Sequence, residues 1–249
     1  GYFAAVTAMD QNVGRLLDCL EEKEMREDTL VIFMSDNGMN MGHHGFFGKG
    51  NGTFPLNMYD TSAKVPAIIS MPGTCPQGAV EDGLFSQYDF FPTLLEFLEL
   101  DNQDAEILPG KSFAPLLSGS SMEGRENVVV FDEYGPVRMI RDNEWKYVHR
   151  YPYGPNELFN LVDDPGERRN LWGEDGTDDR IREMKASLDE FFHRYADPGL
   201  DGTHEAVFGT GQVGLAGPGG RGRNAFVSEY QYMGADGSPR DQGYRPAKP

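Results

Sequence analysis

The feature that most constrains this sequence is a continuous apolar run at residues 29–34, which ends directly in the tetrapeptide SDNG. Such a run is typical of a short strand that is buried on both faces. A second run covers residues 65–70 and ends in the turn sequence MPG. Apolar residues spaced three and four apart predict helices near residues 3–20 and 87–100. This order of elements indicates an α/β domain with a mostly parallel sheet flanked by helices.

The pattern changes after residue 125. Turn residues separate short strand-like runs between residues 126 and 161, which predicts a small antiparallel sheet. A helix over residues 178–195 has one apolar side, and we expect it to pack on this sheet. We expect Trp145 and Phe159 to be largely buried there.

The chain becomes Gly/Pro-rich and polar from about residue 198. We interpret this last part as an extended tail that wraps the body or is partly disordered. The sequence therefore divides into an α/β segment, a small α+β subdomain and a tail, at residues 1–125, 126–197 and 198–249.

The composition excludes some classes of partner. The net charge of -18 argues against a nucleic-acid partner, because phosphate backbones are bound through Lys and Arg. No apolar run reaches the roughly 18–20 residues of a membrane span. The two cysteines, Cys19 and Cys75, form no metal-type cluster. An anionic substrate would need a local positive site in so acidic a chain.

Asp36 and Asn37 are adjacent oxygen donors at the carboxyl end of the first predicted strand. Ligands of open α/β sheets bind at that edge. A carboxylate beside an amide suits a hard cation, either Ca²⁺ or Mg²⁺. The alternative interpretation is a simple turn, since Asp-Asn-Gly also has strong turn chemistry.

A Gly-rich loop follows, and it carries His43, His44 and Lys49. Two histidines without a third ligand are a weak zinc signal, so a histidine that contacts substrate and an exposed histidine remain alternatives. Lys49 lies between two glycines, where the backbone can approach a ligand and the ammonium can hold an anion. An ordinary surface lysine is the other interpretation.

Five stretches resemble the sulfatases of the alkaline-phosphatase-like superfamily, in that family's order. The central one is SDNG…GHHGFFGKG…YDTSAKVPAIISMPG. The others are YFAAVTAMDQNVGRLLDCLEE, SQYDFFPTLLEFLEL with GKSFAPLLSG, VRMIRDNEWKYVHR, and ELFNLVDDPGERRNL. The resemblance covers about residues 2–196 and implies a sulfuric ester hydrolase, with periplasmic or secreted location expected from the family.

The resemblance implies roles for particular residues. Asp36 and Asn37 match ligands of the active-site Ca²⁺ or Mg²⁺, and Lys49 matches a residue that contacts the sulfate group. His44 matches a histidine near the substrate, whereas His43 matches no family role and is a neighbouring candidate for substrate binding. A sulfated small molecule or polysaccharide is the implied substrate.

One departure from the family pattern is large. Sulfatases act through a formylglycine made from the first residue of C/S-x-P-x-R, and the sequence contains no such motif. We therefore expect the nucleophile upstream of this chain, which would make the chain a fragment. The alternatives are a phosphoester or phosphonate hydrolase of the same superfamily and a non-catalytic binding protein on a decayed sulfatase fold.

Overall fold

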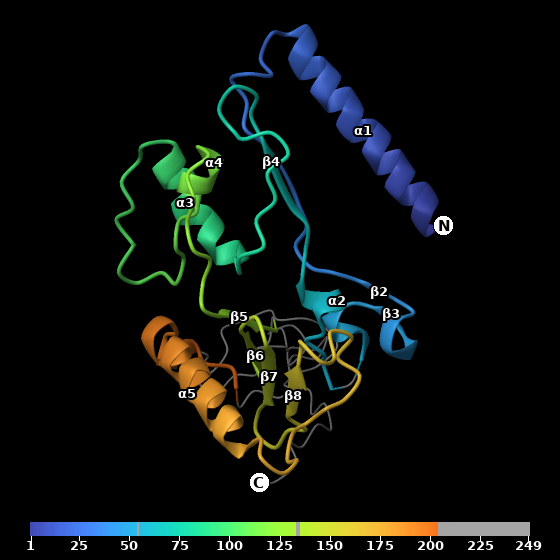
Figure 1. Ribbon diagram of the computed structural model, residues 1–249, viewed down its shortest axis with the longest axis vertical. Coiled ribbons are helices and arrows are strands. Elements are labelled where there is room, and N and C mark those ends of the chain that lie inside the picture. Colours follow the sequence, from blue (N-terminus) through green and yellow to red (C-terminus); the bar gives the residue numbers. More distant parts are fainter. Residues whose placement is uncertain (54, 133–134, 204–249) are drawn as a thin grey trace, which may run out of the picture. The chain divides into compact units, whose positions relative to one another are not determined.

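The computed structural model describes residues 1–53, 55–132 and 135–203 (Figure 1). By contact, the chain forms two compact units. The first unit comprises Gly1–Asn37, Lys64–Glu106 and Gly110–Gly124, and the second comprises the described residues of Gly38–Ala63, of Ile107–Pro109 and from Arg125 onward. These units are defined by contacts and are discontinuous in sequence, so they do not test the boundaries at residues 125 and 197, which stay a prediction.

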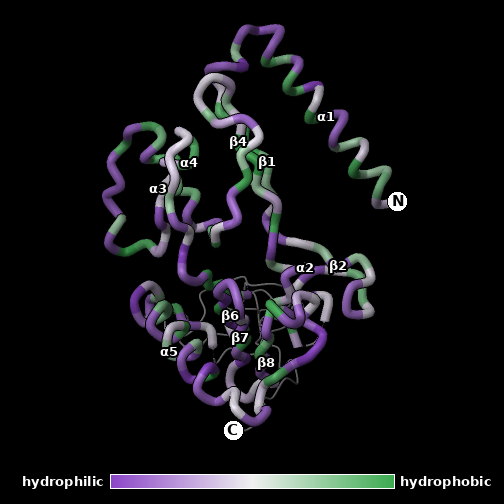
Figure 2. Tube along the Cα trace, in the orientation of Figure 1, coloured by the Kyte–Doolittle hydropathy of each residue, from purple (hydrophilic) through white to green (hydrophobic). Residues whose placement is uncertain are grey.

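The first unit begins with a long amphipathic helix, α1 (Tyr2–Glu22), as the apolar spacing predicts. Hydrophobic and hydrophilic positions alternate along it in Figure 2. No residue of α1 is buried, and Phe3 is 82% exposed. Within the described part of the chain, no helix is long and apolar enough to cross a membrane.

The two apolar runs of the first unit form strands β1 (Val31–Met34) and β4 (Ala67–Ser70). The prediction of parallel pairing is wrong for these two strands, which run antiparallel with Val31 opposite Ser70 and Met34 opposite Ala67. An apolar run indicates burial but does not encode the direction of the neighbouring strand, and mostly parallel sheets often include an antiparallel strand. Neither strand contains a fully buried residue, so the predicted burial on both faces is also wrong here.

The predicted helix at residues 87–100 is shorter in the structure. A 3-10 turn, η3 (Gln87–Asp89), leads into α3 (Phe90–Phe97), and α4 (Ala114–Leu117) follows. Ser86 and Asp89 form a capping box, which satisfies the first backbone N–H groups of η3. The buried Asp89 also accepts a hydrogen bond from the Lys111 backbone N–H at 2.8 Å. This residue therefore joins the start of the helix to the loop before α4.

The second unit is built on a four-stranded antiparallel sheet in the order β5-β6-β7-β8, as the turn residues predict. Its strands are β5 (Val128–Phe131), β6 (Val137–Arg141), β7 (Trp145–Arg150) and β8 (Glu157–Asn160). The remaining elements are β2 (Asn40–Met41), η1 (His43–Gly45), β3 (Phe47–Gly48), η2 (Gly50–Gly52), α2 (Asp60–Ala63), α5 (Asp178–Tyr195) and η4 (Pro198–Leu200).

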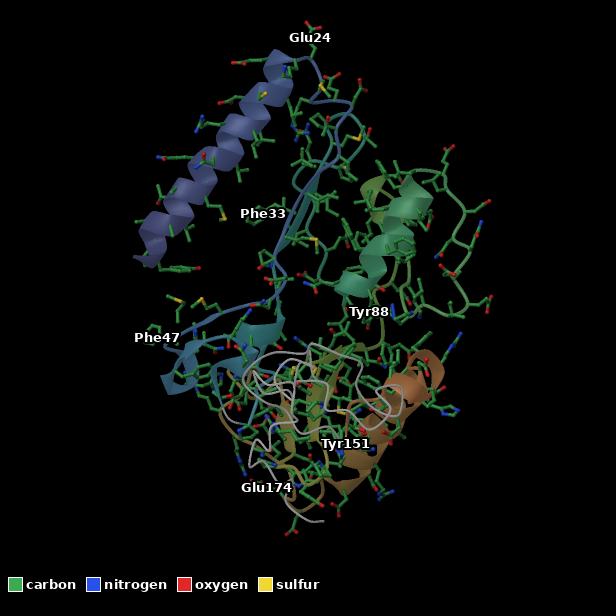
Figure 3. The ribbon with its side chains drawn as sticks, turned by 180° about the vertical axis from the view of Figure 1, so that it is seen from behind. Glu24, Phe33, Phe47, Tyr88, Tyr151 and Glu174 are labelled. Carbon is green, nitrogen blue, oxygen red and sulfur yellow. The ribbon has the colours of Figure 1, made fainter. Side chains whose placement is uncertain are left out.

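Both faces of this sheet are covered. On one face, side chains of the sheet pack against Met184 and Leu188 of α5, and they fill the space between the two layers (Figure 3). On the other face, Met58 packs against a second cluster that includes Val148. Phe159 is buried at 2% exposure, and Trp145 is mostly buried against the cluster on the α5 face, so both expectations are confirmed. The sheet is thus a buried layer between α5 and the segment that contains Met58.

A buried ion cluster fastens that segment to the sheet. Lys146 of β7 is fully buried, and its Nζ donates to the carboxylates of Glu167 and Asp60 and to the Met58 carbonyl oxygen at 3.0 Å. Arg141 donates to the second carboxylate oxygen of Asp60 at 2.6 Å. Burial raises the pKa of Glu167, and the Lys146 ammonium opposes that shift. Each buried charge therefore depends on its partners for compensation.

The predicted tail begins with an ordered contact. Asp201 forms an ion pair with Arg138 of β6 at 2.8 Å, directly after η4. The rest of the predicted tail, residues 204–249, lies outside the described residues.

The ion cluster predicts a large effect for Lys146→Met. This change leaves Glu167 buried without its ammonium partner, so the free energy of unfolding should fall by about 3–5 kcal/mol. Urea unfolding followed by tryptophan fluorescence measures it, because Trp145 and Trp172 both belong to the second unit. The control is Lys185→Met, which removes an i,i+4 pair with Asp189 near the surface and should cost about 0–1 kcal/mol. An equal loss of unfolding free energy in the two variants would contradict the role of Lys146 as the buried partner of Glu167.

His149 predicts a pH dependence of stability. Burial, mainly, lowers its pKa to about 4, and its Nδ1 lies 2.6 Å from the Tyr147 hydroxyl, whose own pKa burial raises. An unfolded histidine has a pKa of about 6.5. Because the unfolded state then binds the proton more tightly, the second unit should lose stability as the pH falls from about 6.5 to about 4.

The variant His149→Asn cannot titrate, so it should lose less stability than the wild type between pH 7.5 and 5.5. Fluorescence-monitored unfolding at the two pH values checks this. An identical loss in both proteins would assign the acid sensitivity to other groups.

Candidate functional site

The first set of candidate residues lies in the turn that follows β1. Asp36 is exposed, and its Oδ1 accepts a hydrogen bond from the Asn37 backbone N–H at 2.8 Å. The Ser35 hydroxyl donates to the Asn37 carbonyl oxygen at 2.9 Å. These bonds give the tetrapeptide the compact turn that its composition predicts. The two candidate metal ligands therefore project from a defined backbone.

Gln87 supports this turn from outside it. Its side-chain Nε2 donates to the carbonyl oxygens of Ser35 at 2.7 Å and Asp36 at 3.0 Å. Sequence reasoning missed this residue, because a glutamine at the start of a helix resembles any surface glutamine. The only local signal is the adjacent Ser86, which marks the helix start and so places Gln87 at a bend of the chain.

The donors at this turn fit part of a hard-cation site. A carboxylate from Asp36 and an amide oxygen from Asn37 are ligands of the type that Ca²⁺ and Mg²⁺ take. Protein Ca²⁺ sites draw on about 6–8 oxygens. Elsewhere among the described residues, there is no group of three or more His, Cys, Asp or Glu side chains that could hold a metal. The pair would thus supply a minority of the ligands.

The second set of candidate residues lies in the loop of β2, η1 and β3 in the second unit. Gly42 and Gly45 have φ angles of 99° and 81°, which favour glycine. His44 adopts a left-handed conformation with φ at 54°. His43 is exposed, and its Nδ1 accepts a hydrogen bond from the Met41 backbone N–H at 3.3 Å. The tight turn therefore presents two consecutive imidazoles.

The imidazole of His44 stacks on the ring of Tyr59, with centroids 3.6 Å apart and planes 6° apart. Partial burial lowers the pKa of His44, and electrostatic interactions with Arg168 and the neighbouring His43 lower it further. The carboxylates of Asp164 and Glu157 act in the opposite direction. The ring is consequently neutral near pH 7, so one nitrogen can donate a hydrogen bond while the other accepts one.

Lys49 is exposed on the same loop, between two glycines. A side chain at Gly50 would bring its Cβ within 3.1 Å of the Asn57 carbonyl oxygen. The Asn57 side chain donates to the carbonyl oxygens of Gly50 at 3.2 Å and Lys49 at 3.4 Å. Gly50 therefore lets the loop approach its own supporting segment, whereas the sequence had suggested a close approach to a ligand. Asn57 was also missed by the sequence analysis.

The sequence-predicted residues fall into two sets. Asp36 and Asn37 belong to the first unit, and His43, His44 and Lys49 belong to one loop of the second unit. Within the loop, the structure gives His44 and Lys49 separate supports, Tyr59 and Asn57, from one short segment.

Comparison with known proteins finds sulfatases by family model and by sequence. The family model described as Sulfatase matches residues 1–100. Choline-sulfatase of Rhizobium meliloti is 34% identical over 181 residues, which cover 68% of this chain and 32% of that protein. The chain thus spans about a third of this relative's length.

Two solved structures share the fold. One, titled as a complex with its substrate D-glucosamine-2-N,6-O-disulfate, has a TM-score of 0.69 and 27% identity, covering 82% of this chain and 42% of that one. The other, phosphonate monoester hydrolase of Agrobacterium radiobacter, has a TM-score of 0.67 and 26% identity, covering 85% of this chain and 44% of that one. These matches confirm the predicted fold class, and together with the family model they show that the chain belongs to the sulfatase family.

Proposed function

We propose that this chain supplies part of the active site of a metal-dependent sulfuric ester hydrolase. The observation that carries the proposal is the Sulfatase match over residues 1–100, because that segment contains every candidate site residue. Asp36 and Asn37 would hold a Ca²⁺ or Mg²⁺ ion, as their oxygen donors fit. When bound, that ion neutralises negative charge on the sulfate group.

Lys49 would hold the sulfate group as a point charge. Its side chain is exposed, and hydrogen bonds from Asn57 fix the backbone of residues 49–50. The loop is therefore already ordered before substrate binds, so the ammonium can be positioned without a further cost of ordering. This local cation matters because the whole chain carries a net charge of -18. An acidic protein can bind a sulfate ester when the site itself is positive.

His44 would contact the substrate beside the sulfate group. Its lowered pKa keeps the imidazole neutral near pH 7. A neutral ring can hydrogen-bond both to a hydroxyl and to an ester oxygen of the substrate. His43, its neighbour on the same turn, would make a second contact to the substrate.

The nucleophile would come from outside this chain. The sequence has no C/S-x-P-x-R motif, so we propose an upstream segment that carries the formylglycine. Its hydrated aldehyde would supply the attacking oxygen. We propose a sulfated carbohydrate as the substrate, because a neighbour with 27% identity is described with a disulfated glucosamine as its substrate.

Phosphonate or phosphate ester hydrolysis is the second candidate, and the similarity to a phosphonate monoester hydrolase favours it. The two activities are distinguished by the ratio of kcat/KM for an aryl sulfate to that for an aryl phosphonate monoester, measured on the protein with its upstream segment. A ratio above one supports the sulfatase. Binding of a sulfated sugar without any turnover would instead support a non-catalytic protein.

The 249-residue chain alone should release no sulfate from an aryl sulfate, even with added Ca²⁺. Its residues stabilise charge, but no covalent intermediate can form without a nucleophile. A sulfate-release assay checks this, with the longer protein as the positive control. Steady turnover by the chain alone would place the nucleophile within these residues.

In the longer protein, Lys49→Ala should lower kcat/KM by about 10²–10³-fold, the scale of losing one charge-stabilising donor. Asp36→Ala should lower it at least as much, because the metal is then released. Lys23→Ala is the matched control, since Lys23 is an exposed lysine at the end of α1. Full activity of Lys49→Ala would remove that residue from the site.

A further inference from the structure

Residues 57–60 touch both parts of the loop that carries the candidate substrate residues. Asn57 is 3% exposed, and its side chain and backbone N–H both donate to the Gly50 carbonyl oxygen, at 3.2 Å and 3.0 Å. Two residues later, Tyr59 covers the imidazole of His44. One short segment therefore supports Lys49 through its backbone and His44 through its side chain.

His44 needs such a support. Its backbone φ of 54° is a left-handed conformation that costs a residue other than glycine free energy. A conformation of that kind persists only where its surroundings determine it. The parallel Tyr59 ring, 3.6 Å away, restricts the rotation of the imidazole and shields one of its faces from water.

Tyr59 is in turn held from its other side. The residues on either side of it are tied to the sheet: Lys146 donates to the Met58 carbonyl oxygen at 3.0 Å, and Asp60 donates its backbone N–H to Glu167 at 2.6 Å. The Tyr59 ring also lies 6.2 Å from the ring of Phe159 in β8. The buried ion cluster of the sheet thus fixes the backbone on which Tyr59 stands.

We propose that Tyr59 is a positioning residue that orients the imidazole of His44 for the substrate, and that Lys146 and Glu167 hold Tyr59 in place. The functional part of this proposal rests on the proposed sulfatase activity. The orientation itself is a property of this chain and can be measured without any substrate.

The first experiment is NMR of the 249-residue chain with labelled histidine. A ring stacked at this distance shifts the His44 ring protons upfield. Tyr59→Phe should keep that shift, whereas Tyr59→Leu should move the signals toward those of a histidine with no ring stacked on it. The pKa of His44 should then rise toward about 6.5, since burial is the main cause of its lowering. Four other groups act on this pKa and are unchanged by the substitution: His43, Arg168, Asp164 and Glu157.

His193, an exposed histidine of α5, is the internal control and should not shift in any variant. Tryptophan fluorescence of the second unit shows whether Tyr59→Leu remains folded, and Tyr59→Trp replaces it as the test ring if it does not, with a larger upfield shift expected. Unchanged His44 signals in a folded Tyr59→Leu chain would overturn the proposal.

The second experiment is a double-mutant cycle in the longer protein. Tyr59→Leu should lower kcat/KM for an aryl sulfate by roughly two- to tenfold, the scale of one aromatic pair, and Tyr59→Phe should restore it. In a His44→Ala background, Tyr59→Leu should have no further effect, because the residue that it positions is gone. Full additivity would contradict the positioning role.

The two experiments separate the two proposals. A protein without sulfatase activity whose His44 signals respond to Tyr59→Leu rejects the proposed function and keeps the stacking support. An active sulfatase whose His44 signals do not respond rejects the support and keeps the function.

Discussion

The buried ammonium of Lys146 is the contact on which most of the second unit depends. It lies on a central strand of the sheet, yet its partners come from two other parts of the chain, the segment around Asp60 and the turn around Glu167. A buried charge tolerates only well-placed partners, because each unpaired neighbour would carry a large desolvation cost. The cluster therefore contributes little net stability, but it requires that Lys146, Asp60 and Glu167 adopt one specific arrangement. Three segments far apart in sequence must meet in a single geometry.

The sequence predicted the elements whose signals are local. The apolar spacing from Phe3 to Leu20 gave α1 nearly to the residue. The turn residues between 126 and 161 predicted the antiparallel sheet, because each group of turn residues marks the end of a short strand. The direction of β4 beside β1 could not be predicted, because hydrophobicity reports burial and not the neighbour's orientation. Trp145 and Phe159 were predictable as core residues, because large aromatic side chains in strands tend to be buried: Phe159 is 2% exposed and Trp145 packs against the cluster on the α5 face.

For the candidate site, the sequence pointed to the residues that could bind a ligand but not to the residues that support them. The resemblance to the sulfatases implies roles for Asp36, Asn37 and Lys49, but it implied none for the residues that support them. Asn57, Tyr59 and Gln87 act through contacts with backbone atoms or with another ring. No spacing rule encodes these contacts, because their partners become neighbours only in the folded chain. Supporting residues of this kind are found in a structure and seldom in a single sequence.

The pairing of β1 with β4 has a consequence for how such a protein can diverge. Met34 and Ala67 face each other across the two strands, so the chain leaves and re-enters the first unit at one place. The intervening segment is anchored at both ends by strands that do not depend on its length, and loop-closure entropy grows only slowly with added residues. Insertions between those two anchors can thus accumulate while the strands keep their register, provided that they leave residues 58–60 on the buried ion cluster. The length of this segment can therefore change in evolution without a matching change in β1 or β4.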